Sequence, residues 1–222
     1  MERNVSMDEI SDGRLYGLND MVKADCRDCR GCSQCCRDMG SSILLDPLDI
    51  HRLREGLGRS FAELLENCLE LNVADGMILP NLKMDEEKNC CVFLDGRGRC
   101  SIHSFRPGIC RIFPLGRFYE NRDFQYFLQI HECPASRSKI KVKKWIDTPD
   151  LQENQKFIRE WHYFLKDLQE TFSTEAGRAR QKQVNIYVLR QFYETAFDGS
   201  REFYGQFWER LKKAREVCGV LA

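Results

Sequence analysis

A run of closely spaced cysteines is the feature that most constrains how this chain can fold. Five thiols fall between positions 26 and 36, at Cys26, Cys29, Cys32, Cys35 and Cys36. Cysteines three positions apart on a tight loop can turn both sulfur atoms toward one metal ion. Further thiols follow at Cys90, Cys91, Cys100, Cys110 and Cys133. We therefore expect these separated segments to converge in space around one or more metal centres.

The cellular compartment decides whether clustered cysteines form disulfides or bind metals. The chain has 12 cysteines among 222 residues, and its N-terminus lacks the charged and then apolar pattern of a signal peptide. No apolar run approaches the roughly 18 residues that span a membrane. We therefore expect a cytoplasmic protein, in which thiols stay reduced and cysteine clusters favour metals. A thiol–disulfide redox switch is the alternative.

The charge balance argues against a nucleic-acid or membrane partner. Lys+Arg and Asp+Glu both number 34, so the formal net charge is zero. Binding to nucleic acid or to an anionic membrane surface depends on an excess of basic side chains. One stretch is locally basic, and we interpret it as the solvated face of a strand: Arg137, Lys139, Lys141, Lys143 and Lys144.

Helix and strand signals are spread along the chain. Asp46-Pro47 predicts a helix start, and Ser60 with Glu63 fits a capping box that opens a helix through about Leu71. Further helices are expected to begin at Thr148, Thr174 and Ser200, the last ending at Gly219, and strands are expected at 43–45, 77–82 and 123–131. The predicted class is α+β, a small irregular cysteine-rich metal-binding domain with short helices and β-hairpins, followed by a C-terminal helical segment.

The same signals predict three parts along the chain. Residues 1–25 are polar and irregular and form an N-terminal extension, with Gly13 and Gly17 breaking any helix. Residues 26–134 hold the cysteine-cluster metal-binding domain, and residues 148–219 form a C-terminal helical region. The helices of the last part are a candidate surface for a protein partner.

The spacing of the thiols is compatible with two kinds of metal centre. Cys26, Cys29, Cys32 and Cys36 follow the C-x2-C-x2-C-x3-C rhythm of bacterial ferredoxins, although an arginine rather than a proline comes next. Paired C-x-x-C knuckles suit zinc equally well. The sulfurs of the vicinal pair Cys35-Cys36 are expected to diverge, so that each serves a different centre.

Other potential ligands have residue environments that are more typical of core packing or structural hydrogen bonding. His103 and His131 lie near thiols in the sequence, and His51 lies on a predicted helix, where a core or hydrogen-bonded histidine is the more common case. Cys68 lies on an apolar helix stripe and Cys218 near the chain end, so neither is expected to bind metal. Several arginines flank the thiols and would offset thiolate charge: Arg27, Arg30, Arg37, Arg99, Arg106 and Arg111.

Four spaced motifs resemble the YkgJ-type cysteine-cluster family, which is described as a zinc- or iron-chelating domain. The motifs are Cys29-x-x-Cys32-x-x-Cys35-Cys36, Cys91-Val-Phe-Leu, Cys100-Ser-Ile-His103, and Arg106-Pro107 through Cys110-Arg111-Ile112-Phe113-Pro114. The resemblance covers roughly residues 26–134 and implies eight metal ligands: Cys29, Cys32, Cys35, Cys36, Cys91, Cys100, Cys110 and Cys133. Cys26 and Cys90 lie outside this pattern and remain additional candidates.

Three functions remain open at this point. We favour a 4Fe-4S-type iron–sulfur protein with a structural or redox role, because the ligands are all thiols and exceed the four that a zinc module needs. A zinc-binding interaction module is the second reading. The third is a protein lysine N-methylase-like enzyme using S-adenosylmethionine, which the resemblance allows. No pair of acidic residues is placed by a motif that would name a catalytic residue.

Overall fold

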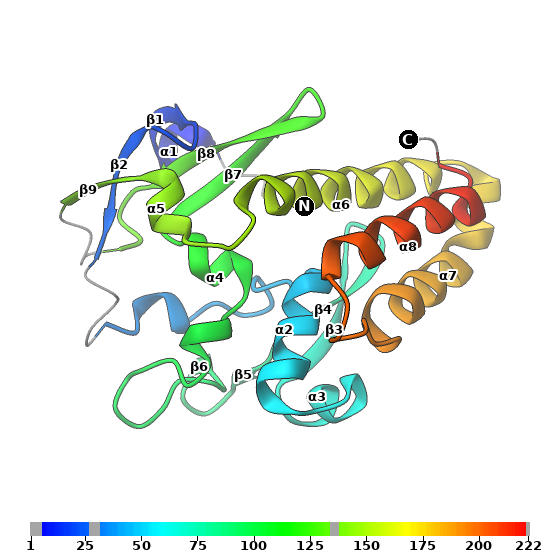
Figure 1. The fold of residues 1–222 in the computed structure, drawn as a ribbon, viewed down its shortest axis with the longest axis horizontal. Helices are drawn as coiled ribbons and strands as arrows, with labels where there is room; N and C mark the ends of the chain where they lie inside the picture. Colours follow the sequence, from blue (N-terminus) through cyan, green and yellow to red (C-terminus); the bar gives the residue numbers. More distant parts are fainter. Residues whose placement is uncertain (1–5, 27–31, 134–137, 221–222) are drawn as a thin grey trace. The chain divides into compact units, whose positions relative to one another are not determined.

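The computed structural model describes residues 6–26, 32–133 and 138–220 (Figure 1). Their contacts divide the chain into two compact units, each built from segments that are far apart in the sequence. The helical unit comprises Leu44–Leu82 and Gln155–Ala222. The cysteine unit comprises Glu2–Ile43 and Lys83–Asn154.

The helical unit begins with two short helices that cap themselves. Helix α2 (Pro47–Leu57) and helix α3 (Phe61–Asn67) each start with a capping box, at Asp46 and Ser60. The Asp46 carboxylate accepts the Asp49 N–H at 2.8 Å, and the Glu63 carboxylate accepts the Ser60 N–H at 2.8 Å. These side chains satisfy N–H groups that the first helical turn leaves without partners. Both predicted helix starts are confirmed.

A hairpin follows, and the C-terminal helices complete the helical unit. Strand β3 (Leu69–Ala74) pairs antiparallel with β4 (Met77–Leu82), and Asp75 and Gly76 make the turn with positive φ. The remaining elements are α6 (Leu151–Thr171, which begins in the cysteine unit), α7 (Glu175–Leu189), the π-helix η3 (Arg190–Glu194) and α8 (Phe203–Cys218). Asn185 of α7 joins hairpin and helix, because its side chain accepts the Ile78 N–H at 2.6 Å and donates to the Gly76 carbonyl at 3.0 Å.

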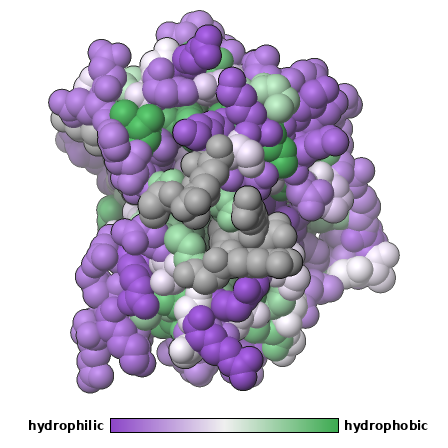
Figure 2. Space-filling model, turned by 90° about the vertical axis from the view of Figure 1, so that its left-hand side faces the viewer, coloured by the Kyte–Doolittle hydropathy of each residue, from purple (hydrophilic) through white to green (hydrophobic). Residues whose placement is uncertain are grey.

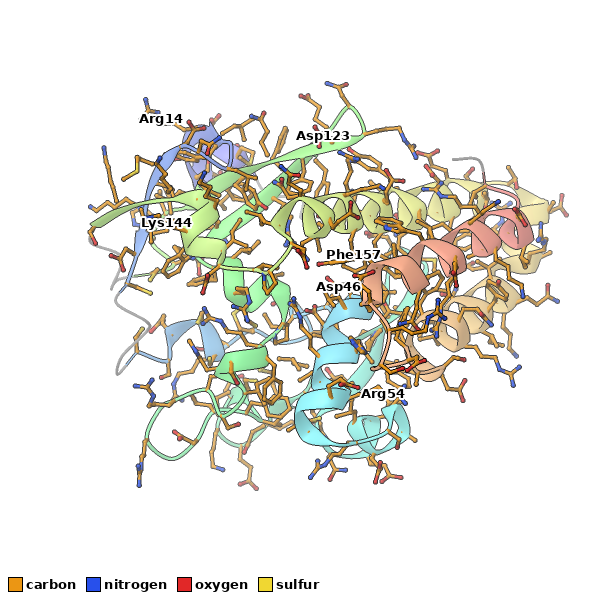
Figure 3. All side chains as sticks on the ribbon, in the orientation of Figure 1. Arg14, Asp46, Arg54, Asp123, Lys144 and Phe157 are labelled. Atoms are coloured by element: carbon orange, nitrogen blue, oxygen red, sulfur yellow. The ribbon has the colours of Figure 1, made fainter. Side chains whose placement is uncertain are left out.

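Aromatic rings fill the core of the helical unit. Phe157, labelled in Figure 3, contacts Phe207 with ring centroids 4.6 Å apart, and both side chains are fully buried. Trp161 contacts Phe192 at 4.9 Å. Phe157 and Trp161 are spaced one helical turn apart, so they fall on the same buried face of α6. These aromatic side chains of α6 therefore form part of the core.

The cysteine unit consists of small sheets and short helical turns. A three-stranded antiparallel sheet has the order β1–β8–β7, and two-stranded sheets pair β2 with β9 and β5 with β6. The strands are β1 (Ser11–Tyr16), β2 (Met21–Asp25), β5 (Met84–Asp85), β6 (Cys90–Cys91), β7 (Leu115–Glu120), β8 (Asp123–Gln129) and β9 (Ser138–Lys141). The helical turns are α1 (Met7–Ile10), η1 (Gln34–Cys36), η2 (His103–Phe105), α4 (Gly108–Ile112) and α5 (Val142–Ile146).

The core of the cysteine unit is small and lies under its first strands. It is formed by Tyr16, Val22, Ala24, Ile112, Leu115, Tyr126, Val142 and Ile146. Trp145 joins α5 to α4 by donating from Nε1 to the Ile112 carbonyl at 3.0 Å. Few large apolar side chains are buried here, so hydrophobic burial stabilises this unit less than it stabilises the helical unit.

The α+β class with a C-terminal helical segment is confirmed, and several local predictions are corrected. Residues predicted to be irregular form α1, β1 and β2, because Tyr16, Val22 and Ala24 become core side chains. The expected strand at 43–45 is a single bridge between Leu44 and Asn81. Helix α3 ends at Asn67, and β3, which was not predicted, begins at Leu69.

Two predicted helix caps in the C-terminal segment also differ. Helix α6 begins at Leu151 rather than at Thr148, whose hydroxyl instead donates to the Ile146 carbonyl. Helix α8 is capped by Glu202, which accepts the N–H groups of Tyr204 and Gly205, and not by Ser200. The predicted cap at Thr174 and the helix end at Gly219 are confirmed.

Hydrophilic side chains cover most of the described surface on the face drawn in Figure 2. None of the helices in the described part of the chain combines the length and hydropathy that crossing a bilayer requires.

Candidate metal centre

The cysteines proposed as ligands belong to one of the two units. The cysteine unit spans every candidate position, and the described ones are Cys26, Cys32, Cys35, Cys36, Cys90, Cys91, Cys100, Cys110 and Cys133. Cys29 lies outside the described residues. Cys68 and Cys218 belong to the helical unit, where both are buried. The sequence distinction between candidate ligands and incidental thiols thus coincides with the division into units.

The first vicinal pair lies on a tight turn. Helix η1 is closed by the Cys36 N–H donating to the Ser33 carbonyl at 3.0 Å and the Arg37 N–H donating to the Gln34 carbonyl at 3.1 Å. The Cys35 thiol hydrogen-bonds to the Cys36 sulfur, which with burial raises the pKa of Cys35 well above its usual value. The two thiols therefore interact with each other, and the assignment of each sulfur to a different centre stays a prediction.

The second vicinal pair forms the short strand β6. Cys90 and Cys91 pair with Asp85 and Met84 of β5, and both cysteines are buried. The outer edge of β6 is bridged by the backbone that leaves η1, with Arg37 opposite Cys90. The main chain thus brings the residue after one cysteine pair next to a member of the other.

A second link secures this bridge. The Asp38 N–H donates to the Asn89 carbonyl at 3.1 Å, and the Asn89 side-chain amide donates to the Asp38 carboxylate. Both residues adopt positive φ, which Asn and Asp tolerate better than most side chains. Sequence reasoning missed this pair, although the Asn before Cys90 and the Asp after Arg37 are the residue types that such turns require.

The loop from Cys91 to Cys100 closes on itself. Leu94 forms a bridge with Cys100 and donates its N–H to the Cys91 carbonyl at 2.9 Å. The Asp95 carboxylate accepts the N–H groups of Arg99 at 2.8 Å and Arg97 at 2.9 Å, and these bonds lower the pKa of Asp95. Cys100 is therefore held near the start of the loop by a single bridge and not by paired strands.

Hydrogen bonds connect Cys100 to the motif that carries Cys110. The His103 N–H donates to the Cys100 carbonyl at 3.3 Å, and the His103 ring Nε2 lies 2.9 Å from Arg106 Nη1. Arg111, next to Cys110 on α4, donates from Nη2 to the Ser104 carbonyl at 3.1 Å. These contacts order the whole segment from Cys100 to the end of α4.

The three histidines named as possible ligands lie in environments that fit other roles. His103 is paired with Arg106, and His131 is an exposed residue with positive φ after β8. His51 lies in the helical unit and stacks on Phe203 with ring centroids 5.4 Å apart. The described contacts therefore favour the plainer roles for these histidines.

Arg106 is the flanking arginine whose charge reaches a cysteine of η1. Its charge acts against the raised pKa of Cys35, and its Nε atom is buried without a hydrogen-bond partner among the described residues. Arg37 instead donates to the Ser33 hydroxyl at 3.2 Å, and Arg111 is anchored on backbone carbonyls. Arg27 and Arg30 lie outside the described residues.

The described residues alone do not form a complete set of ligands for a metal ion. In the ranges 6–26, 32–133 and 138–220, no group of three or more Cys, His, Asp or Glu side chains is close enough to hold one metal ion. Among the candidate ligands, the structure brings together Cys35 and Cys36 and places Cys90 beside the backbone that follows them. Cys32, Cys35, Cys36 and Cys90 are free thiols.

Comparison with known proteins supports the family resemblance of this segment. No curated protein and no solved structure matches the chain. Residues 28–134 match the model of the CxxCxxCC family, described as "Putative zinc- or iron-chelating domain". The matched stretch holds the two vicinal pairs and the loop motifs described above. Residues 28–134 of this chain therefore resemble the CxxCxxCC family, whose domain is described as zinc- or iron-chelating.

Proposed function

We propose that the cysteine unit binds one or more iron–sulfur clusters of the 4Fe-4S type, with a structural or redox role. The proposed ligands are Cys29, Cys32, Cys35, Cys36, Cys91, Cys100, Cys110 and Cys133, with Cys26 and Cys90 as further candidates. The observation that carries this proposal is the main-chain bridge between Arg37 and Cys90, which sets two vicinal thiol pairs near each other within a zinc- or iron-chelating domain.

The donor set favours iron–sulfur over zinc. A 4Fe-4S cluster takes four thiolates, whereas structural zinc sites commonly include histidine. Here His103 is engaged by Arg106 and His131 is exposed, which leaves sulfur as the main donor type of the unit. Free thiols at Cys35, Cys36 and Cys90 are in keeping with the reduced state of the cytoplasm, where we place the protein.

The residues around the thiols have roles that follow from their contacts. A cluster held here would supply one-electron transfer or a cross-link between chain segments. The Arg106 guanidinium lies within electrostatic range of Cys35 and would stabilise a thiolate there. His103 fixes the orientation of Arg106, and Arg111 holds the backbone that carries Cys110.

Anaerobic purification followed by metal analysis tests this proposal. We expect a brown protein that contains iron and acid-labile sulfide and little zinc. Cys36→Ser should lose most of the metal, since it removes a ligand from the bridged pair. Cys218→Ala, in the helical unit, is the matched control and should retain the metal content of the wild type.

Each contrary result has a defined meaning. A colourless protein with stoichiometric zinc would replace the cluster by a zinc-binding module, whose partner surface would then be sought on the C-terminal helices. A metal-free and fully folded protein would reject both readings. Calorimetric titration with S-adenosylmethionine examines the methylase-like alternative, and the iron–sulfur proposal expects no heat of binding.

A further inference from the structure

A cavity in the helical unit has no part in the metal centre. It has a volume of about 300 Å³ and lies between the second half of α2, the turn that leads to α3, and the π-helix η3 with the residues after it. This volume is at the lower end of the range found for ligand sites, which fits a small molecule. π-helical turns occur frequently at functional sites.

Aromatic side chains form one wall of the cavity. Phe197 and His51 both line it, and their rings meet edge to face with centroids 6.0 Å apart. His51 is held by stacking on Phe203. Burial lowers the pKa of His51, so this ring is neutral near pH 7. Phe197 is buried, and the Arg210 guanidinium lies over its ring at 3.8 Å from the centroid, so the wall offers the half-buried His51 ring and a small part of Phe197.

Two arginines at the edge of the cavity carry unused donors. Arg54, labelled on α2 in Figure 3, donates from Nη1 to the Glu194 carbonyl at 3.1 Å. Its other N–H groups, and all those of the Arg59 side chain, have no hydrogen-bond or ion-pair partner in the part of the chain that the structure describes. The Thr195 hydroxyl is also without a described partner.

The π-helix explains why positive charge collects here. Its wide turn is closed by the Thr195 N–H donating to the Arg190 carbonyl at 2.9 Å. The carbonyls of Gln191, Thr195 and Ala196 are then satisfied by the guanidinium of Arg210, at 2.7, 2.8 and 2.6 Å. Arg54 caps the neighbouring Glu194 carbonyl, so two guanidinium groups lie within electrostatic range of each other.

One acidic side chain lines the cavity beside these arginines. The carboxylate of Glu55 lies against Gly199, where an added Cβ would be 2.8 Å from Oε1. Arg54 and Arg59 outnumber it among the lining residues, and Arg210 lies within electrostatic range of Arg54. Glu63, outside the lining, lies within electrostatic range of Arg59. Like charges placed side by side are costly unless an anion lies between them.

We propose that this cavity binds a small organic anion, whose carboxylate or phosphate contacts Arg54 and Arg59 and whose flat apolar body packs against the His51 ring and the exposed part of Phe197. The planar guanidinium group presents paired donors that match either kind of oxyanion. The Thr195 hydroxyl supplies a further donor. Metal binding and this site are independent, since all the lining residues belong to the helical unit.

Titration of the full-length, metal-loaded protein with simple probes tests the site. Benzoate and phenyl phosphate combine the required anion with a flat ring and separate a carboxylate ligand from a phosphate ligand. We expect at least one of them to bind with 1:1 stoichiometry in calorimetry, and inorganic phosphate and benzyl alcohol to bind at least about tenfold more weakly, a loss of about 1.4 kcal/mol.

Arg59→Gln is the decisive variant, because this side chain makes no described hydrogen bond whose loss would disturb the fold. We expect it to weaken binding of the preferred probe at least about tenfold. Arg52→Gln is the matched control, since Arg52 lies on α2, just before the turn that carries Arg59, and outside the cavity lining, and it should bind like the wild type. Binding that is unchanged in Arg59→Gln, equal affinity for benzyl alcohol, or no binding of either aryl anion would overturn the proposal.

Discussion

Each of the two units of the molecule is stabilised internally by a different kind of side chain. The helical unit buries a continuous set of aromatic rings, in which Phe207 contacts Phe157, Trp161 and Phe192 and Trp161 also contacts Phe192. The cysteine unit has a core of small size and short strands, joined by loops that carry most of the thiols. Domains with little apolar burial commonly need disulfides or metals for stability. The contrast indicates that one unit is stable through packing and the other through its ligand chemistry.

The same contrast separates two roles of cysteine. Cys68 and Cys218 are buried in the helical unit, where burial raises the pKa of each thiol and keeps it neutral. They serve as small hydrophobic side chains. Cys35 instead shares a hydrogen bond with Cys36 and lies in the field of Arg106. Residue type alone does not distinguish these roles, but the position of a thiol on a helix stripe or on a turn does.

Removing the metal should have the largest effect on stability, and this effect should be confined to the cysteine unit. Structural metal sites can contribute about 10 kcal/mol or more to folding. We expect chelation of the metal, under reducing conditions, to raise hydrogen exchange throughout the segments of the cysteine unit and to leave α7 and α8 protected. Exchange measured by mass spectrometry reports both regions in one experiment. Uniform exchange before and after chelation would mean that packing holds both units.

Truncation of a core aromatic ring should destabilise the helical unit and not the cysteine unit. Phe207 is fully buried and contacts Phe157, Trp161, Phe192 and Phe203. Phe207→Ala should lower the free energy of unfolding of the helical unit by about 3–5 kcal/mol while the metal content stays unchanged. Urea titrations followed by fluorescence report mainly this unit, because two of the three tryptophans, Trp161 and Trp208, belong to it and Trp145 belongs to the cysteine unit. A parallel loss of metal would show that the units are not energetically separate.

The smallest predicted effect concerns pH and the N-terminal strands. Burial, with the hydrogen bond that Tyr16 donates to the Asp12 carboxylate, raises the pKa of Tyr16 to about 12. An unfolded chain loses this proton near pH 10. Between about pH 10 and 12 the unfolded state therefore binds fewer protons, and stability falls as the pH rises. Tyr16→Phe should reduce this fall in urea titrations of the cysteine unit. Identical pH profiles for variant and wild type would contradict this account.

Local signals in the sequence were sufficient wherever a few neighbouring residues determine the structure. The capping residues Asp46 and Ser60 and the helix end at Gly219 were all identified, because each depends on contacts within one turn. The strands of residues 11–25 were missed, because β1 pairs with β8 and β2 with β9, more than a hundred positions away. Such pairing leaves no local periodic signal in a short polar segment.

The candidate site was predictable in its chemistry and not in its arrangement. Cysteine spacing and the motif around Arg106-Pro107 identified a zinc- or iron-chelating domain, which the family comparison supports. The bridge between Arg37 and Cys90 depends on two backbone segments meeting across more than fifty residues, which spacing does not encode. The cavity at Arg54 and Phe197 was missed for the same reason, since it joins α2 to a π-helix.

The Asp38–Asn89 contact means that the junction between the two cysteine pairs is specified by peptide groups and by left-handed backbone, and not by the side chain at position 37. Arg37 can therefore vary without separating the pairs, as long as the flanking Asx residues are kept. A β-branched residue at either Asx position would resist positive φ and draw the paired segments apart. Whether a substitution in this region is tolerated should thus depend more on the backbone conformation that it allows than on its charge.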